Sequence, residues 1–72
     1  MEDKNELRRR IDESGISITA LAKKIGVSRG TLYKKVDGTS YFNSDEISGL
    51  IDALHLTGND VTRIFFGIES DR

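Results

Sequence analysis

Two stretches near the middle of the sequence begin with the same arrangement of residues. In each, an apolar residue is followed by a serine and then, four positions after the serine, by a leucine: Ile16, Ser17 and Leu21, and again Val27, Ser28 and Leu32. A serine in this place caps the free amide groups of a helix, and the two apolar residues pack across its first turn. Gly26 lies between the stretches and allows a sharp turn. The pattern predicts two short helices, 17–24 and 28–36, joined at a glycine.

The apolar residues outside these stretches also recur at helical spacing, and the chain has no proline. Leu7 and Ile11 are four residues apart and predict a first helix over residues 3–14. A fourth helix is expected to begin with Ser44 as its N-cap, followed by acidic residues where the helix dipole favours negative charge. Its inward-facing stripe comprises Ile47, Leu50, Ile51 and Leu54.

A fifth helix is expected directly afterwards. Thr57 and Asp60 have the spacing of a capping box at its start, and Gly67 is expected to end it. Its inner face comprises Ile64, Phe65 and Ile68. We therefore predict a compact, all-α, five-helix domain over residues 1–67, followed by a short C-terminal tail, 68–72.

Charge is unevenly distributed along the chain, although the formal net charge is only −1. Residues 1–13 sum to −1, residues 14–36 to +5 and residues 37–72 to −5. The middle segment contains no acid, and its basic residues are Lys23, Lys24, Arg29, Lys34 and Lys35. Each lysine alone is typical of a hydrated helix surface. Their clustering favours a surface that faces nucleic acid.

The composition argues against an enzyme. With no cysteine and a single histidine, His55, neither a nucleophile–base pair nor a set of metal ligands can be assembled. We expect no metal, no cofactor and no small-molecule substrate. No apolar run approaches the length of a membrane span or of a signal peptide, so we expect a soluble, cytoplasmic protein without a membrane partner.

The segment SITALAKKIGVSRGTLYKKVDG, Ser17–Gly38, resembles the lambda-repressor-like (Cro/CI-type) helix-turn-helix proteins of temperate phages of Gram-positive bacteria. The segment SDEISGLIDALHLTGNDVTRIFFG, Ser44–Gly67, is similar to helices four and five of the same family. The resemblance covers roughly residues 5–67. It implies that the helix over 28–36 enters the major groove of DNA by its N-terminal end, while the preceding helix crosses the phosphate backbone.

The resemblance also implies which residues contact DNA. It further implies that the protein acts in the cytoplasm of the bacterial host cell. The base-contact candidates are Arg29, Gly30, Thr31, Tyr33 and Lys34. The phosphate-contact candidates are Ser17, Thr19, Lys23, Ser28, Lys35 and Arg10. Arg29 can donate a bidentate pair of hydrogen bonds to guanine, which typically gives about 1–3 kcal/mol of discrimination. Gly30 reads no base, but it allows DNA to approach the backbone closely.

The sequence departs from the family pattern at several positions. Ile18 stands where the family often has a glutamine that anchors to phosphate, and Asp37 would repel a phosphate near the end of the third helix. Many relatives pair an arginine on helix one with a glutamate at the end of helix three. Here Ile11 and Val36 occupy those places, so we expect an apolar contact instead. These changes affect DNA affinity more than they affect the fold.

Two functional hypotheses follow. The first is a Cro-like regulator that binds double-stranded operator DNA, as a homodimer, to set a lysis–lysogeny decision. The second is an anti-repressor or modulator that binds the phage's own CI-type repressor and binds DNA weakly or not at all. The net charge, the acidic C-terminal half and Gly30 favour the second hypothesis. Its candidate interface residues are Phe66, Ile68, Asp45 and Glu46. Two alternatives stay open for Phe66: it points outward as part of an apolar patch, or it packs under the first helix.

Overall fold

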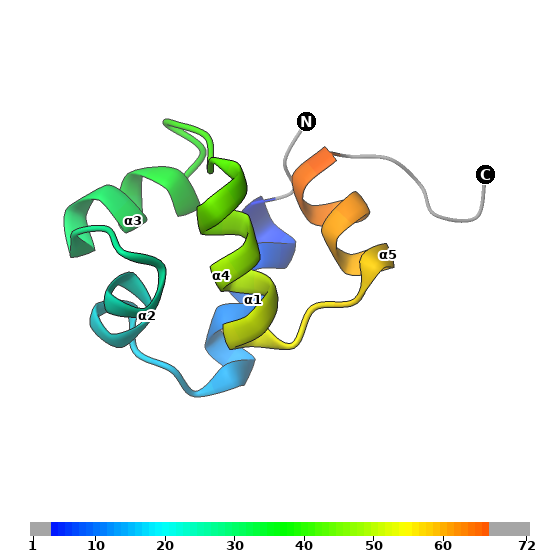
Figure 1. Ribbon diagram of the computed structural model, residues 1–72, viewed down its shortest axis with the longest axis horizontal. Coiled ribbons are helices and arrows are strands. Elements are labelled where there is room, and N and C mark those ends of the chain that lie inside the picture. Colours follow the sequence, from blue (N-terminus) through cyan, green and yellow to red (C-terminus); the bar gives the residue numbers. More distant parts are fainter. Residues whose placement is uncertain (1–3, 67–72) are drawn as a thin grey trace.

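The computed structural model describes residues 4–66, and within that range the chain is helical and has no strand. Its elements are α1 (Lys4–Ser14), α2 (Ile18–Ile25), α3 (Arg29–Val36), α4 (Ser44–Leu54), α5 (Gly58–Val61) and the π-helical turn η1 (Thr62–Phe66). Figure 1 shows α2 and α3 at one end, α4 and α1 in the middle, and α5 at the other end. The prediction of a compact, all-α, five-helix fold is confirmed.

The expected helix end at Gly67, the interface candidate Ile68 and the tail over 68–72 all lie outside the described residues. None of the helices in residues 4–66 has the length and the apolar character that a membrane crossing requires.

The two central helices begin at the predicted serines. Ser17 Oγ accepts a hydrogen bond from the backbone N–H of Ala20 at 3.1 Å. Ser28 Oγ accepts one from the backbone N–H of Thr31, also at 3.1 Å. Gly26 ends α2 with a φ of 81°, a conformation that glycine adopts without the strain a Cβ would bring. Helices α2 and α3 are therefore separate and individually capped, as predicted.

The start of α4 corrects the prediction by one residue. Asn43, not Ser44, is the N-cap: its Oδ1 accepts a hydrogen bond from the Glu46 backbone N–H at 2.8 Å. Glu46 Oε1 in turn accepts one from the Asn43 backbone N–H at 2.9 Å. Asparagine caps as well as serine does, and the reciprocal bond from Glu46 favours this register. The predicted capping box of Thr57 and Asp60 is present at α5.

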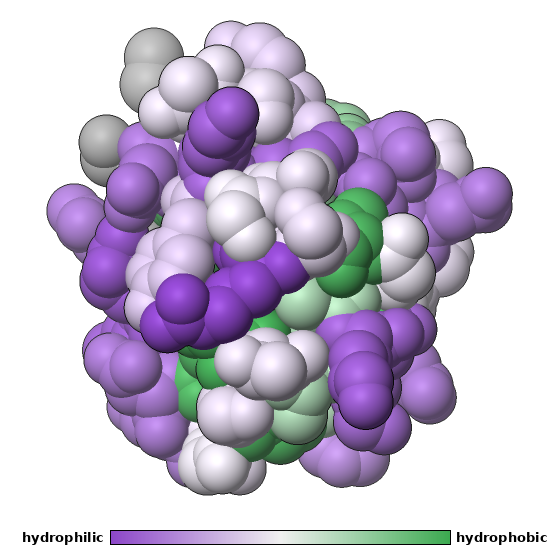
Figure 2. Space-filling model, turned by 90° about the vertical axis from the view of Figure 1, so that its left-hand side faces the viewer, coloured by the Kyte–Doolittle hydropathy of each residue, from purple (hydrophilic) through white to green (hydrophobic). Residues whose placement is uncertain are grey.

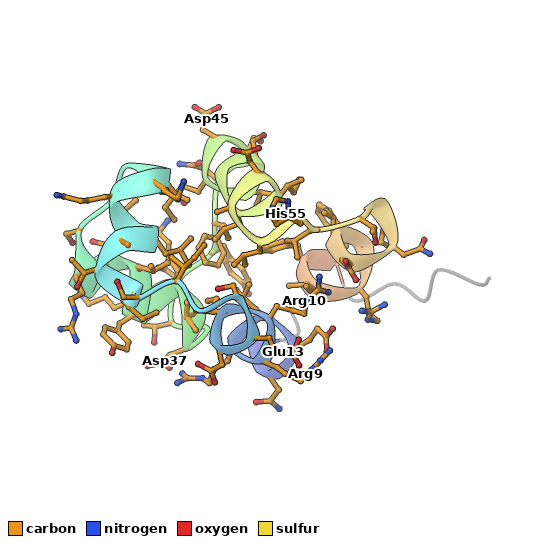
Figure 3. All side chains as sticks on the ribbon, turned by 90° about the horizontal axis from the view of Figure 1, so that it is seen from below. Arg9, Arg10, Glu13, Asp37, Asp45 and His55 are labelled. Carbon is orange, nitrogen blue, oxygen red and sulfur yellow. The ribbon has the colours of Figure 1, made fainter. Side chains whose placement is uncertain are left out.

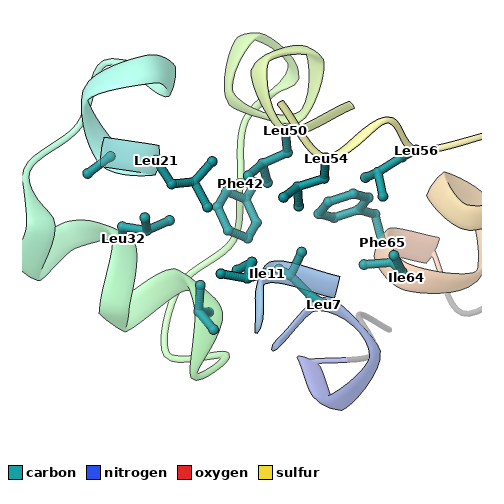
Figure 4. Packing of buried hydrophobic residues seen from close by; sticks show 12 residues of the cluster. Leu7, Ile11, Leu21, Leu32, Phe42, Leu50, Leu54, Leu56, Ile64 and Phe65 are labelled. Carbon is teal, nitrogen blue, oxygen red and sulfur yellow. The ribbon is translucent and has the colours of Figure 1, made fainter. Parts of the chain in front are cut away.

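One hydrophobic cluster joins the helices (Figure 4). Its buried members are Leu7, Ile11, Leu21, Ala22, Leu32, Val36, Phe42, Leu50, Leu54, Leu56, Ile64 and Phe65. Ile47 and Ile51, which were predicted to be core residues, are only half-buried and pack against the edge of the cluster. Ile11 and Val36 are both buried members of this cluster, in agreement with the apolar contact expected at these two positions.

Helical periodicity does not predict that Phe42 is a core residue, because Phe42 lies in the loop between α3 and α4. It is nevertheless only 7% exposed. Its ring meets that of Phe65 edge to face, with the centroids 5.7 Å apart and an interplanar angle of 86°. Figure 4 shows Phe42 between Leu21 and Leu32 on one side and Phe65 on the other. This loop residue therefore connects the helix pair α2–α3 to the C-terminal turns.

Helices α2 and α4 pack against each other at Gly49. A Cβ added to Gly49 would lie 2.8 Å from Ile25 Cγ2, and the β-branched Ile25 has little freedom to move away. We predict that Gly49→Ala lowers the free energy of unfolding by about 1–2 kcal/mol, because overpacking outweighs the gain in helix propensity. The measurement is urea unfolding monitored by circular dichroism.

The chain offers a matched control for this substitution. Gly30 is also helical, but a Cβ added there meets nothing within 4 Å. Gly30→Ala is therefore expected to raise the free energy of unfolding by about 0.5–1 kcal/mol. If Gly49→Ala stabilised the protein to the same extent, the close packing of α2 on α4 would be refuted.

Charged side chains connect α1 to the C-terminal turns. Arg10 Nη1 lies 3.0 Å from Asp60 Oδ1. Arg63 Nη2 lies 3.1 Å from the same oxygen and 3.0 Å from Glu6 Oε2. Hydrogen bonds from Arg9 and Arg63 lower the pKa of Glu6 below its usual value. The network keeps its carboxylates ionised at neutral pH.

We predict that acid weakens the fold through Asp60. The backbone N–H of Thr57, together with Arg10, lowers the pKa of Asp60 from 3.8 to about 2, although burial acts in the opposite direction. Because the folded-state pKa lies below the unfolded one, the stabilisation is complete above about pH 5 and is lost as the pH falls toward 2. The shift corresponds to about 2 kcal/mol.

Thermal unfolding between neutral and acidic pH measures this effect. The unmodified chain should lose Tm as the pH falls, and Asp60→Asn should lose less because it has no carboxylate to protonate. Equal losses in the two proteins would show that Asp60 does not link stability to pH.

Candidate nucleic-acid interface

Helices α2 and α3 form one end of the molecule, and Figure 2 looks onto that end. Hydrophilic side chains cover much of this face around smaller areas of hydrophobic surface. Its exposed basic side chains are Lys23 and Lys24 in the last turn of α2, and Arg29 and Lys34 at the two ends of α3. We call the face formed by these four exposed residues the α2–α3 surface; Lys35, which is also on α3, is half-buried and lies outside it.

The other basic side chains that the structure describes are paired with carboxylates. The pairs are Arg8 with Asp37, Arg9 with Glu6 and Glu13, Arg10 with Asp60, Lys35 with Glu46, and Arg63 with Glu6 and Asp60. Within residues 5–66, no carboxylate forms such a pair with a basic residue of the α2–α3 surface. Uncompensated positive charge in the described part of the chain is thus concentrated on this surface, despite the net charge of −1.

Two side chains on α3 contact each other across one helical turn. The Cζ atom of Arg29 lies 5.0 Å from the centroid of the Tyr33 ring, within the range of a cation–π interaction. Arg29 Nη2 also donates a long hydrogen bond, 3.4 Å, to Tyr33 Oη. Tyr33 is 38% exposed, so this contact lies at the surface of α3.

Most of the predicted DNA contacts lie at the surface of these two helices or at their starts. Those that are exposed are Ser17, Thr19, Lys23, Ser28, Arg29, Gly30, Tyr33 and Lys34. Thr31 is half-buried, and its Oγ1 accepts a hydrogen bond from the Ser28 hydroxyl at 2.9 Å. Helix α3 follows α2 after a three-residue turn, residues 26–28, which is the geometry of a helix-turn-helix.

Comparison with known proteins agrees with this geometry. Residues 6–64 match the family described as the Cro/C1-type HTH DNA-binding domain. The chain belongs to this Cro/C1-type family. Searches of curated proteins and of solved structures gave no match. The Cro/C1-type domain is thus a DNA-binding module of the kind found in transcriptional regulators, with α2 and α3 as its helix-turn-helix.

Two side chains that we expected to bind phosphate have other partners in this Cro/C1-type domain. Arg10 lies on α1, pairs with Asp60 at 3.0 Å and has only 22% of its side chain exposed. Lys35 Nζ lies 2.8 Å from Glu46 Oε1 and donates to the Tyr41 carbonyl at 2.9 Å. Because either side chain would have to give up these partners to reach DNA, we leave both out of the proposed interface.

Glu46 corrects another expectation. It was a candidate for a protein interface, but it is only 7% exposed. Burial raises its pKa, yet the hydrogen bonds from Lys35 and from the Asn43 amide outweigh burial and lower the pKa below its usual value. The ion pair with Lys35 therefore joins the last turn of α3 to the first turn of α4. The neighbouring candidate, Asp45, is exposed and points away from the helices (Figure 3).

The acid at the end of α3 is partly neutralised. Asp37 accepts a hydrogen bond from Arg8 of α1, and both side chains are about half exposed. The positive charge of Arg8 weakens the repulsion that Asp37 was expected to exert on a phosphate. Sequence spacing does not indicate this pair, because its members lie 29 residues apart.

The two adjacent phenylalanines of η1 differ in burial, and the exposure of Phe66 favours the outward of its two alternatives. Phe65 is buried, whereas Phe66 is 54% exposed. Phe66 belongs to the C-terminal turns and lies outside the α2–α3 surface. It is one of the large hydrophobic side chains that the described residues leave exposed, together with Tyr33 and Tyr41.

Proposed function

We propose that this Cro/C1-type domain is a regulator of a phage lysis–lysogeny switch that binds operator DNA. The observation that carries the proposal is the charge distribution: the four exposed basic side chains of α2 and α3, Lys23, Lys24, Arg29 and Lys34, lack carboxylate partners in the described structure. Lys35 and the basic side chains described on the other elements have such partners. The origin in a temperate phage of Gram-positive bacteria rests on the resemblance of the segments Ser17–Gly38 and Ser44–Gly67.

In this proposal α3 lies in the major groove with its N-terminal end toward the base edges. Arg29 donates to guanine O6 and N7, and Lys34 reaches a guanine or a phosphate. Gly30 lets the backbone approach DNA closely, and its open surroundings are compatible with that role. The phosphate contacts come from Ser17, Thr19, Lys23 and Ser28.

A second copy of the chain supplies the second half-site in this proposal. One domain of this size, residues 1–67, presents a single α3 and therefore few base contacts. Dimeric helix-turn-helix proteins double these contacts and read two half-sites one helical turn of DNA apart.

A second candidate function is modulation of a CI-type repressor through protein contacts. The exposed ring of Phe66 and the exposed carboxylate of Asp45 favour it. Both belong to the acidic C-terminal half of the chain, and an exposed aromatic ring is typical of a surface that binds another protein. In this alternative the domain binds DNA weakly or not at all by itself.

A titration with DNA from the protein's own regulatory region separates the two functions. The measurement uses fluorescence anisotropy with the chain alone and with the neighbouring repressor present. Saturable binding by the chain alone, weakened by Arg29→Ala, supports the operator-binding function. If the chain alone shows no binding but removes the repressor from its DNA, the modulator function replaces it. Phe66→Ala should then abolish the effect.

A further inference from the structure

The contact between Arg29 and Tyr33 gives α3 a feature beyond a row of basic residues. In the described residues Arg29 has no carboxylate partner and contacts Tyr33: its Cζ lies 5.0 Å from the ring centroid and its Nη2 lies 3.4 Å from Oη. The orientation of the guanidinium is therefore set by an aromatic ring on the same helix, four residues later.

We propose that Tyr33 is a positioning residue, which holds the Arg29 guanidinium for hydrogen bonding to guanine. The inference rests on the proposed DNA-binding function and deepens it. A free arginine loses rotamer freedom when it binds a base, and a side chain that is already held against a ring loses less. The ring neutralises no charge, so the guanidinium keeps its full attraction for DNA, unlike the arginines that are paired with carboxylates.

The geometry leaves the necessary donors available. Arginine has five N–H donors, and the hydrogen bond to Tyr33 involves only Nη2. Nη2 carries two N–H groups, so the one that is not bonded to Tyr33 can act together with an N–H of Nη1 or of Nε toward the O6 and N7 acceptors of a guanine. Both side chains are exposed, so the contact is made on the face of α3 that the proposed function turns toward DNA.

A double-mutant cycle tests this role. The DNA affinities of four proteins are compared: the unmodified chain, Tyr33→Leu, Arg29→Ala and the double variant. The DNA is the duplex from the regulatory region that the unmodified chain binds most tightly. We expect Tyr33→Leu to weaken binding about two- to fivefold in the unmodified chain, as the loss of a cation–π contact implies, and to have no further effect when Arg29 is absent. Tyr33→Phe keeps the ring and should bind nearly as well as the unmodified chain.

Modified DNA gives a second measurement, which would not change if Tyr33 only stabilised the fold. Each guanine of the duplex is replaced in turn by 7-deazaguanine, which lacks the N7 acceptor. At the guanine read by Arg29 the unmodified chain should discriminate against the replacement. Tyr33→Leu should reduce that discrimination and leave the effect of every other replacement unchanged.

The possible failures are distinguishable. If Tyr33→Leu weakens binding equally with and without Arg29, then Tyr33 contacts DNA by itself and the positioning role is overturned. If Tyr33→Leu leaves affinity and discrimination unchanged, the positioning role is also overturned. If the unmodified chain binds no DNA, the proposed function fails and the inference fails with it.

Discussion

Phe42→Ala is expected to lower the free energy of unfolding by about 3–5 kcal/mol. This is a large share of the total free energy of unfolding that is typical of a chain of 72 residues. Phe42 is only 7% exposed and its ring packs edge to face against Phe65. Its removal leaves a cavity between the helix pair α2–α3 and the C-terminal turns (Figure 4). Urea unfolding at neutral pH measures the loss.

The preceding residue provides the control. Tyr41 is also aromatic and lies in the same loop, but it is 75% exposed. Tyr41→Ala should therefore change the free energy of unfolding by no more than about 0.5 kcal/mol. Similar losses for the two variants would mean that the loop as a whole, and not the buried ring, stabilises the fold.

Lys35→Met is expected to cost about 3 kcal/mol at neutral pH, because it leaves the carboxylate of Glu46 charged, buried and without its partner. The side chains of Lys35 and Glu46 are only 14% and 9% exposed, so water replaces the lost contact poorly. The methionine keeps most of the apolar length of the lysine. Most of the loss therefore reports the unpaired charge, and urea unfolding again measures it.

A second substitution and a change of pH identify the cause. Lys35→Met combined with Glu46→Gln removes the charge but keeps an oxygen for the Asn43 amide, so it should recover most of the stability. Lys35 normally lowers the pKa of Glu46, so its removal raises that pKa. The penalty in Lys35→Met should then shrink as the pH falls and the carboxyl takes up a proton. A penalty that is independent of pH and persists in the double variant would refute the account.

Local patterns predicted much of the fold because they involve residues within one turn of each other. The caps at Ser17 and Ser28, the turn at Gly26 and the box of Thr57 with Asp60 all depend on spacings of three or four residues. The same reasoning misplaced the start of α4 by one residue. The reciprocal bonds between Asn43 and Glu46 favour Asn43 over Ser44 as the N-cap.

These local patterns did not predict the packing between elements. Phe42 lies in a loop, where neither helical period nor alternation marks a core residue, and Gly49 differs from other glycines only because Ile25 of α2 lies against it. Both positions are defined by residues far away in the sequence.

The same distinction applies to the candidate interface: the sequence predicted its helices, but not the ion pairs between helices. The resemblance indicated α2 and α3 correctly as the helix-turn-helix, and the acid-free segment over 14–36 indicated where positive charge gathers. The sequence did not reveal that Arg10 and Lys35 are paired with Asp60 and Glu46. Such pairs join separate helices, and only the folded chain brings their members together.

The salt dependence of DNA affinity tests the central claim most directly. Two substitutions that each remove one positive charge are compared: Lys23→Ala on the α2–α3 surface and Arg9→Ala on α1, where Arg9 pairs with Glu6 and Glu13 (Figure 3). The account predicts that affinity falls steeply with salt, that Lys23→Ala reduces the logarithmic slope by about 0.9 because a phosphate contact is lost, and that Arg9→Ala leaves the slope unchanged. Equal effects of the two substitutions, or an affinity independent of salt, would contradict it.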